Sequence, residues 1–534
     1  MDSHKTDAGL VSGFGVFKFD LNVGQTCEFL HPSGLVSDEC AKCISMLCFP
    51  DSQSIATKST TVDCLYYFTY RFRSSSIKCT QPASVTPPLI CCYVYFRQVE
   101  DVTSARGYYQ KSFVLFSNSP SVQEDLLSYT RSIGLKYFLA ESAGCGVDVL
   151  VDALVELNKF QSDSVPLSRS STVFDDPNHI AGYRRQQLSI GQSHIDISDL
   201  FFSFLDALWY LWESIMVGIP VLVYADEPDI VCHMVTELNR LISPFPPRTN
   251  TYPYLSIFDP QYSAFIKHVP TGSIVGVTSP MAFEQLRVSF PVLLCITSDN
   301  VPTSSSSHIK VCDSMYGSVW LSDSITSVSS GTRDRMTSIM RNWSPIATED
   351  SSYRLSIPSE SETVRSKLVM SNINNDDEFS KSINRGIIRN YFHSLTRDFL
   401  IPFVRYIELD SLAIRQNPTS KTPICEKFCH RKFLSSLAPI GFFQTSVPSH
   451  KIHVLYDKFI RTSHFHDWLV GSQESSNIDS VILHATILSE KFVKSPLFVE
   501  RIHAVVNLTR SIDPHHKHPA LAQSAQNLIN LLDV

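Results

Sequence analysis

Several side-chain arrangements in this sequence have types and spacings that could carry chemistry, and two cysteines are the most suggestive. Cys40 and Cys43 have the spacing of half a zinc site, but the second pair would have to be Cys425 and Cys429, far along the chain. The same spacing puts both thiols on one face of an amphipathic helix, which is ordinary for a buried face. We therefore favour core packing over metal binding at these cysteines.

The other catalytic and nucleotide-binding motifs are incomplete. The segment 191–195, Gly-Gln-Ser-His-Ile, lacks the final glycine of a nucleophile elbow, and no Walker motif occurs. Gly13-Phe14-Gly15 and Gly144-Cys145-Gly146 lack the third glycine of a dinucleotide-binding loop. No acidic partners stand at ligand spacing from the histidines of the C-terminal part, His464, His466, His515, His516 and His518. We expect no covalent catalysis, no metal and no cofactor.

The composition narrows the class of protein further. The chain has 534 residues with a formal net charge of −7, and 43% of its residues are hydrophobic. This composition excludes a disordered chain, and the acidic balance disfavours binding to a phosphate backbone. No apolar leader occurs near Met1, and the longest apolar run, 200–225, contains acidic residues, glycine and proline. We expect a multidomain cytoplasmic protein in which the 14 cysteines are reduced.

The N-terminal part is typical of a β-rich unit built around one helix. Aromatic and β-branched residues predict strands at 14–21, 26–30, 64–72, 89–99 and 108–116. Ser37 is the expected N-cap of a helix over 38–47, whose first turn is acidic. From 121 to 161 the hydrophobic period becomes helical.

Further along the chain, strands and helices alternate, which indicates an α/β layer. The run 200–225 predicts a buried helix and then a buried strand, and later segments predict a helix at 227–242 and strands at 273–277 and 292–296 around a helix at 281–288. In the helical C-terminal part we expect Pro402 to end one apolar stripe, and a second stripe follows Pro519. The expected domains are residues 1–160, a linker at 161–194, an α/β lobe at 195–300, a serine-rich insertion or loop at 301–366, and a helical region at 367–534.

Several motifs, taken in order, resemble DENN-domain proteins. The segments most specific for this resemblance are Tyr-Val-Tyr-Phe-Arg-Gln-Val at 93–99 and Arg-Gly-Tyr-Tyr-Gln-Lys-Ser at 106–112, which look like the signature of the sixth DENN subfamily, related to Avl-nine and Afi-type proteins. One departure is Ile219, at a position where the family usually has an acid. Other matching segments are Phe49-Pro50-Asp51-Ser52, Tyr70-Arg71-Phe72-Arg73, Leu211-Trp212-Glu213, Gly218-Ile219-Pro220, Tyr252-Pro253-Tyr254 and Tyr391-Phe392.

The resemblance implies a fold and an activity. The implied fold is mixed α/β, with a longin-like N-terminal lobe, an α/β DENN lobe and a helical C-terminal extension. The implied activity is guanine-nucleotide exchange on a Rab GTPase of the recycling endosome, with both lobes contacting the GTPase in the cleft between them. The candidate interface or signature residues are Phe96, Arg97, Gln98, Arg106, Tyr108, Tyr109, Gln110, Lys111, Trp212, Glu213 and Asp259.

Each of these assignments has a simpler structural alternative. Arg97 and Arg106 could instead pair with Glu100 or Asp101, and Tyr108 could pack in the core. Trp212 lies in an apolar helix, and the position of Asp259 before a proline favours a turn. For the whole chain, the alternatives to exchange are a non-catalytic Rab-binding scaffold or adaptor with the DENN fold and, less favoured, an unrelated cytosolic hydrolase.

Overall fold

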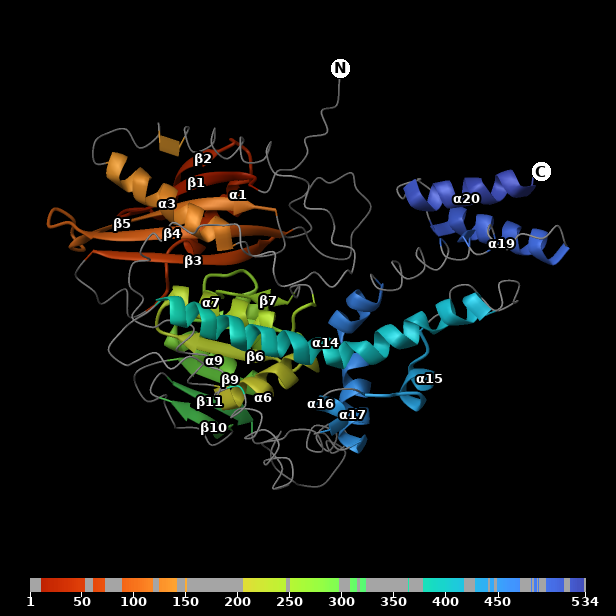
Figure 1. Ribbon diagram of the computed structural model, residues 1–534. Coiled ribbons are helices and arrows are strands. Elements are labelled where there is room, and N and C mark those ends of the chain that lie inside the picture. The colour runs from red at the N-terminus through yellow and green to blue at the C-terminus, as the bar shows by residue number, and fades with distance from the viewer. Residues whose placement is uncertain are drawn as a thin grey trace, which may run out of the picture. The chain divides into compact units, whose positions relative to one another are not determined.

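The computed structural model describes most of the chain, drawn as ribbons in Figure 1. Its contacts divide the chain into two units, residues 1–243 with 247–392 and residues 244–246 with 393–534. The described residues are 11–52, 61–72, 89–118, 124–141, 149–150, 205–245, 250–296, 308–314, 317–322, 364, 378–416, 428–439, 442–445, 449–470, 482, 485–486, 488, 496–512 and 519–532. The expected linker at 161–194 lies outside them.

The first unit begins with an antiparallel five-stranded sheet in the order β2-β1-β5-β4-β3 (Figure 1). All five strands were expected, and each expected end lies within two residues of the observed one because the aromatic and β-branched runs are sharply bounded. The strands are β1 (Gly13–Asp20), β2 (Gly24–His31), β3 (Val62–Arg71), β4 (Leu89–Glu100) and β5 (Tyr108–Ser117). We call this sheet, with helices α1 and α3, the first lobe.

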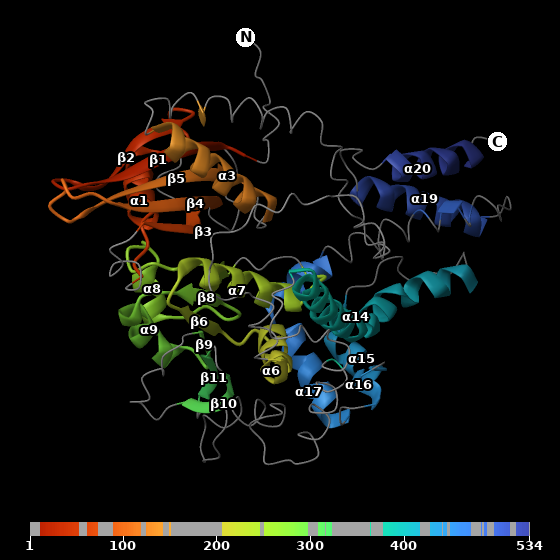
Figure 2. The same ribbon diagram turned by 60° about the vertical axis from the view of Figure 1, so that its left-hand side comes forward.

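Helices α1 (Asp38–Leu47) and α3 (Glu124–Glu141) cover opposite faces of the sheet. The Ser37 hydroxyl caps α1 by accepting a hydrogen bond from the Cys40 N–H, as expected. The Tyr66 hydroxyl donates to the C-terminal carbonyl of α1, on the face that Tyr66 shares with Phe96. On the opposite face α3 packs against Tyr95, and both views place it along the sheet (Figures 1 and 2).

A second sheet of six strands follows, in the order β10-β11-β9-β6-β8-β7. Four neighbouring strands of this sheet, β9, β6, β8 and β7, are parallel. The helices α7 and α9 lie on opposite sides of these four strands (Figure 2). We call this sheet, with α6 to α9, the second lobe. Its elements are α6 (Leu205–Met216), β6 (Val221–Ala225), α7 (Pro228–Leu241), β7 (Thr251–Tyr252), α8 (Tyr262–Lys267), β8 (Ile274–Val277), α9 (Pro280–Leu286), η3 (Arg287–Ser289), β9 (Val292–Ile296), β10 (His308–Ser314) and β11 (Gly317–Ser322).

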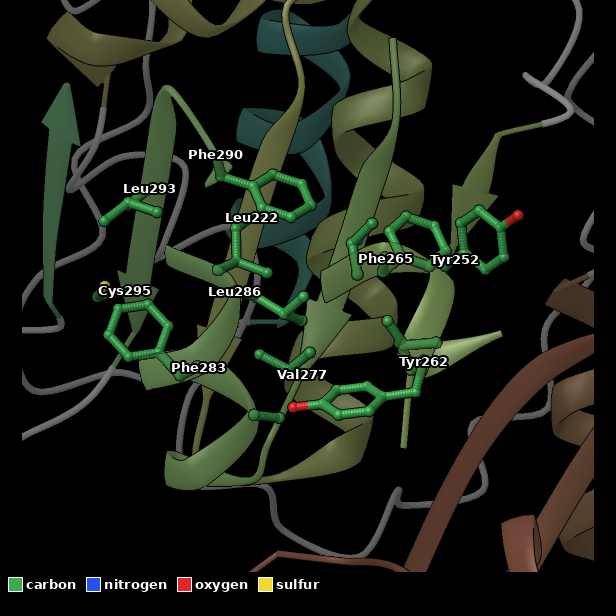
Figure 3. Packing of buried hydrophobic residues seen from close by; sticks show 13 residues of the cluster. Leu222, Tyr252, Tyr262, Phe265, Val277, Phe283, Leu286, Phe290, Leu293 and Cys295 are labelled. Carbon is green, nitrogen blue, oxygen red and sulfur yellow. The ribbon is translucent and has the colours of Figure 1, made fainter. Parts of the chain in front are cut away.

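The core of the second lobe lies between its sheet and the helices α8 and α9 (Figure 3). Side chains from alternate positions of the parallel strands point into it, among them Leu222, Val277 and Leu293, and they meet Phe265 and Phe283 from the helices. Such strands are buried on both faces, which explains their continuous apolar runs. On the other face Gly276 is required, because a Cβ there would lie 2.3 Å from a backbone oxygen.

The second unit is helical. Helix α14 (Glu378–Gln416), which belongs to this unit from residue 393 on, runs through Pro402, so our expectation that this proline ends the helix was wrong. Aromatic packing on both sides of the proline outweighs the missing hydrogen bond: Phe399 stacks on Tyr456 and Phe403 on Phe433, each pair at 4.3 Å between ring centroids. The other helices are α15 (His430–Ser435), α16 (Phe442–Thr445), α17 (Ser449–Ile460), α19 (Pro496–Ile512) and α20 (Pro519–Leu532), the last two packed on each other.

The expected fold class is confirmed: an antiparallel sheet lobe comes first, an α/β lobe follows, and the C-terminal region is helical. The expected domain boundaries stay a prediction. The elements that we did not expect include β7, α8 and the hairpin β10–β11, which extends the second sheet from within the serine-rich stretch. None of the helices in the described ranges combines the length and apolar character needed to cross a bilayer.

Candidate functional site

Arg97 is tied into the first lobe by an acid on the neighbouring strand. Its Nε and one terminal nitrogen donate to the two carboxylate oxygens of Asp63 at 2.6 and 2.7 Å. The two residues face each other directly across the β3–β4 ladder, and the guanidinium also lies 5.2 Å from the Phe138 ring centroid. The acid that Arg97 pairs with is therefore Asp63, not the neighbouring acids named from the sequence. The bidentate pair fixes the side chain within its own sheet.

Lys111 lies inside the first lobe, with only 2% of its side chain exposed. Its ammonium lies 2.7 Å from a Glu28 carboxylate oxygen, contacts the Glu141 carboxylate, and donates to the Tyr137 hydroxyl at 3.1 Å. Burial by itself would lower the pKa of Lys111, but the hydrogen bonds from the two acids and the tyrosine outweigh it and raise the pKa. Lys111 therefore joins β5, β2 and α3 and does not present its charge to a partner.

Arg106 is the one candidate residue whose side chain is exposed in the described part of the chain. It lies in the turn between β4 and β5, and its guanidinium carbon is 4.1 Å from the Phe19 ring centroid. The strand register brings the β1–β2 turn to the same end of the sheet. These two turns also expose Leu21, Val23 and Val102, which are 52%, 76% and 88% exposed. We call these three aliphatic residues and Arg106 the hairpin edge.

The other candidates on β4 and β5 are half-buried or buried. Gln98 is fully buried, and its side-chain carbonyl accepts a hydrogen bond from the Gln110 amide at 2.8 Å across the ladder. Tyr108 and Tyr109 are half-buried at the start of β5. These residues hold the β4–β5 ladder together next to the hairpin edge.

Phe96 packs against the segment 48–52, a contact that we did not predict from the sequence. Its ring packs edge-on against Phe49 at 6.0 Å, and Phe49 in turn packs edge-on against Phe19 at 6.2 Å. The backbone carbonyl just before Phe49, that of Cys48, accepts a hydrogen bond from the Ser112 hydroxyl at 2.6 Å. The start of the segment 48–52 is thus anchored in the core of the first lobe.

The end of the same segment is bound by the second lobe through Asp51. One carboxylate oxygen of Asp51 accepts from the Tyr254 hydroxyl at 2.6 Å and from the Thr278 hydroxyl at 2.9 Å, and the other accepts from the Ile257 N–H at 3.0 Å. The Asp51 N–H donates back to the Tyr254 oxygen at 2.9 Å. Burial, with the nearby Asp51 charge, raises the pKa of Tyr254 well above its usual value, so the phenol stays protonated as a donor.

Two further contacts complete the junction between the lobes. The Ser52 hydroxyl donates to the carbonyl of Asp226, just after β6. Strand β3, at the edge of its sheet, is covered by α7: the Tyr67 hydroxyl bonds Thr236, and the Cys232 thiol donates to the Tyr67 carbonyl at 3.3 Å. Covering an exposed strand edge in this way satisfies its backbone groups and fixes the strand against the helix.

The candidates in the second lobe are buried. Trp212 and Glu213 lie within α6, so their side chains serve its packing. Asp259 makes a turn, because its carboxylate accepts from the Gln261 N–H two residues on at 2.7 Å. Burial raises the pKa of Asp259 to about 6, against the lowering effects of that hydrogen bond and of the Arg71 charge. Ile219 is also largely buried, directly after α6.

Metal binding finds no support in the described part of the chain, where no three cysteine, histidine or acidic side chains gather at ligand distance. Cys40 is buried on α1 and Cys43 is half-buried beside it, both as free thiols. Buried free thiols at Cys91, Cys92, Cys232 and Cys295 act as small apolar side chains, and burial raises the pKa of each.

The sequence is similar to curated proteins along nearly its whole length. No family model matches it. Protein DENND6A of Mus musculus is 25% identical over 546 residues, which cover 93% of this chain and 82% of that protein. Protein DENND6B of Homo sapiens is 23% identical over 546 residues, covering 93% and 85%. The DENND6 homolog of Dictyostelium discoideum is 23% identical over 569 residues, covering 90% and 73%.

Proposed function

We propose that this chain, which is a DENN-domain protein of the DENND6 type, is a guanine-nucleotide exchange factor for a Rab GTPase. The observation that carries the proposal is its similarity to DENND6 proteins over about nine-tenths of its length. The two directly joined lobes support it, because exchange of this kind needs a rigid surface and no reactive group of its own.

The energetics of exchange define what such a surface must do. A GTPase that holds its nucleotide with a Kd between about 1 nM and 1 pM binds it with roughly 12–16 kcal/mol. An exchange factor accelerates release by binding the opened, nucleotide-poor form better than the loaded form. Each tenfold gain in release rate requires about 1.4 kcal/mol of this difference to act in the transition state. An interface of about 1,200–2,000 Å² that holds the first switch segment away from the nucleotide is large enough.

The hairpin edge is the part of the first lobe that we assign to this contact. It combines an exposed arginine, a residue type enriched in protein interfaces, with three exposed aliphatic side chains whose apolar surface a partner would bury. The remaining candidates on β4 and β5, including Arg97 and Lys111, support it from within the lobe. We also propose that the protein is cytoplasmic and is recruited to recycling endosomes through its Rab and other partners.

A panel of Rab proteins loaded with fluorescent GDP tests the proposal. The full chain is added at increasing concentration, and release is followed as loss of fluorescence. Accelerated release from at least one Rab supports exchange. Binding with unchanged release would instead support the Rab-binding scaffold, which Ile219 favours as a departure from the family pattern. Absence of binding to every Rab would overturn both.

A further inference from the structure

The segment 48–52 joins the two lobes over a very short length of chain. Phe49 packs in the core of the first lobe, and Asp51, two residues later, is bound by the second lobe. Two residues span at most about 7 Å, so little slack separates the two anchor points. A shift of one lobe against the other must therefore break either the aromatic packing at Phe49 or the hydrogen bonds of Asp51.

Asp51 sits at a distinctive place on the second lobe. Thr278 directly follows β8, and Asp226, the partner of Ser52, directly follows β6. These strands are parallel neighbours, so both contacts lie at the carboxyl edge of the sheet. In open α/β sheets this edge is where ligands commonly bind. Here a segment of the first lobe, 51–52, contacts this edge at β6 and β8.

The chemistry of the contact requires a carboxylate. Both oxygens of Asp51 act only as acceptors, and they face three donors of the second lobe, Tyr254 and Ile257 from the segment between β7 and α8 and Thr278 from the end of β8. An asparagine would turn an NH₂ group towards a donor in either of its orientations, which leaves that donor unsatisfied. The three donors lie more than 200 residues along the chain, so the contact is purely tertiary.

We propose that Asp51 is a positioning residue for nucleotide exchange. It holds the two lobes in one relative arrangement, in which both contact the GTPase, and it does not itself touch the nucleotide. The inference rests on the proposed exchange function, because it explains how the two-lobed surface is kept rigid. Loosening the lobes leaves each part of the surface intact, so the GTPase still binds, but within the complex it lowers the population of the arrangement that opens the switch segment.

Asp51→Asn and Asp51→Ala test this role in the full chain, with Asp457→Asn as the matched control. Among the described residues, Asp457 has two side-chain partners, Arg461 and His430, and both lie within the second unit. The first readout is backbone hydrogen exchange at 254–259. We expect exchange there to speed up at least tenfold in the Asp51 variants, and the amides of α3 and α9 to remain protected.

The second readout is the rate of GDP release from a Rab that responds to the wild type. We expect the maximal rate at saturating protein to fall at least tenfold, and the concentration for half-maximal effect to change less than threefold. Tyr254→Phe removes the donor to the Asp51 carboxylate and the acceptor of the Asp51 N–H, but it keeps the ring and the other two donors to Asp51, so it should give a smaller loss in the same direction. It also serves as the test variant if the Asp51 variants do not fold.

The outcomes separate the two proposals. If the wild type accelerates no Rab, the exchange function fails, and the hydrogen-exchange readout still decides whether Asp51 joins the lobes. Unchanged protection at 254–259 overturns the inference, whatever the release rates are. Lost protection with an unchanged maximal rate also overturns it, since the lobes would then be free and exchange would not depend on their placement.

Discussion

The Arg389 guanidinium forms two hydrogen bonds with the Glu237 carboxylate, one of them from Nε at 2.9 Å, although the residues are 152 positions apart. Glu237 lies on α7 and also pairs with Arg240, at 2.6 Å. Beside this ion cluster, the Trp209 indole N–H donates to the Tyr391 hydroxyl at 3.1 Å. Together these contacts attach the first half of α14 to α6 and α7 within the first unit.

Glu237→Gln should therefore destabilise the first unit strongly. The carboxylate is 5% exposed and balances two guanidinium groups, which an amide cannot do. Because both arginines are about one-third exposed and can recover water, we expect a loss of about 2–3 kcal/mol in unfolding free energy.

Urea unfolding measures this loss, and Glu284→Gln is the matched control. Glu284 pairs with Arg287 on the surface of the second lobe, with 42% of its side chain exposed, so its loss should not exceed about 1 kcal/mol. Equal losses in the two variants would show that the Glu237 cluster does not attach α14.

Asp259 should make the stability of the protein depend on pH in an unusual direction. Its pKa is raised from 3.8 to about 6 by burial, so the folded state binds this proton more tightly than the unfolded state does. Its contribution is fully present below pH 3.8 and is lost as the pH rises through about 6. A two-unit shift corresponds to at most about 3 kcal/mol.

Asp259→Asn removes this dependence and keeps an oxygen that can accept from the Gln261 N–H. We expect the variant to gain up to about 3 kcal/mol relative to the wild type between pH 4 and pH 7.5. Asp101→Asn is the control of opposite sign, because side-chain and backbone hydrogen bonds lower the pKa of Asp101. A constant difference between Asp259→Asn and the wild type across this range would contradict the assignment.

The Arg97–Asp63 pair should act in stability and not in exchange. A double-mutant cycle with Arg97→Lys and Asp63→Asn should give a coupling of about 1 kcal/mol, since lysine cannot replace both hydrogen bonds. The release rate per folded molecule should change less than twofold. A tenfold loss of exchange in a stable Arg97→Lys protein would place Arg97 in the interface instead.

Arg106→Ala should have the opposite effect: it should weaken binding to the Rab and change the stability of the protein little. Its side chain is exposed and its packing on Phe19 contributes only about 0.5–1 kcal/mol to stability. If the hairpin edge contacts the Rab, removal of an arginine there should weaken binding by about 1–2 kcal/mol, a five- to thirtyfold change. Surface plasmon resonance against the responding Rab measures it. Arg461→Ala, an exposed arginine in the second unit, is the control, and equal effects in both variants would remove the hairpin edge from the interface.

Local sequence patterns predicted most of the strands and helices of the first lobe, but they could not predict which residues contact each other across the fold. The strands of the first lobe and helix α1 follow from residue type and capping, which act within a few residues. The partner of Arg97 could not be predicted, because it depends on the register between β3 and β4. Continuation of α14 past Pro402 depends on aromatic side chains contributed by α15 and α17.

In the candidate site, too, the sequence indicated the segments but not the contacts of their side chains. The signature segments drew attention to the β4–β5 region as a candidate site, which stays a prediction, and the sequence could not separate the exposed Arg106 from the buried Lys111. Asp51 was part of a matching motif and was not singled out, since its donors lie more than 200 residues away. The local sequence around Asp51 offers one signal, a carboxylate directly after the pair Phe49-Pro50. Because Phe49 is buried, this carboxylate lies close to the core and needs hydrogen-bond donors there.

We propose that this protein opens a GTPase through surface contacts alone. Stopped-flow release of fluorescent GDP from a Rab panel, at several concentrations of the full chain, measures this most directly. We predict a saturable rise in the release rate of at least tenfold for at least one Rab. Saturable binding to a Rab without any change in release would contradict the claim.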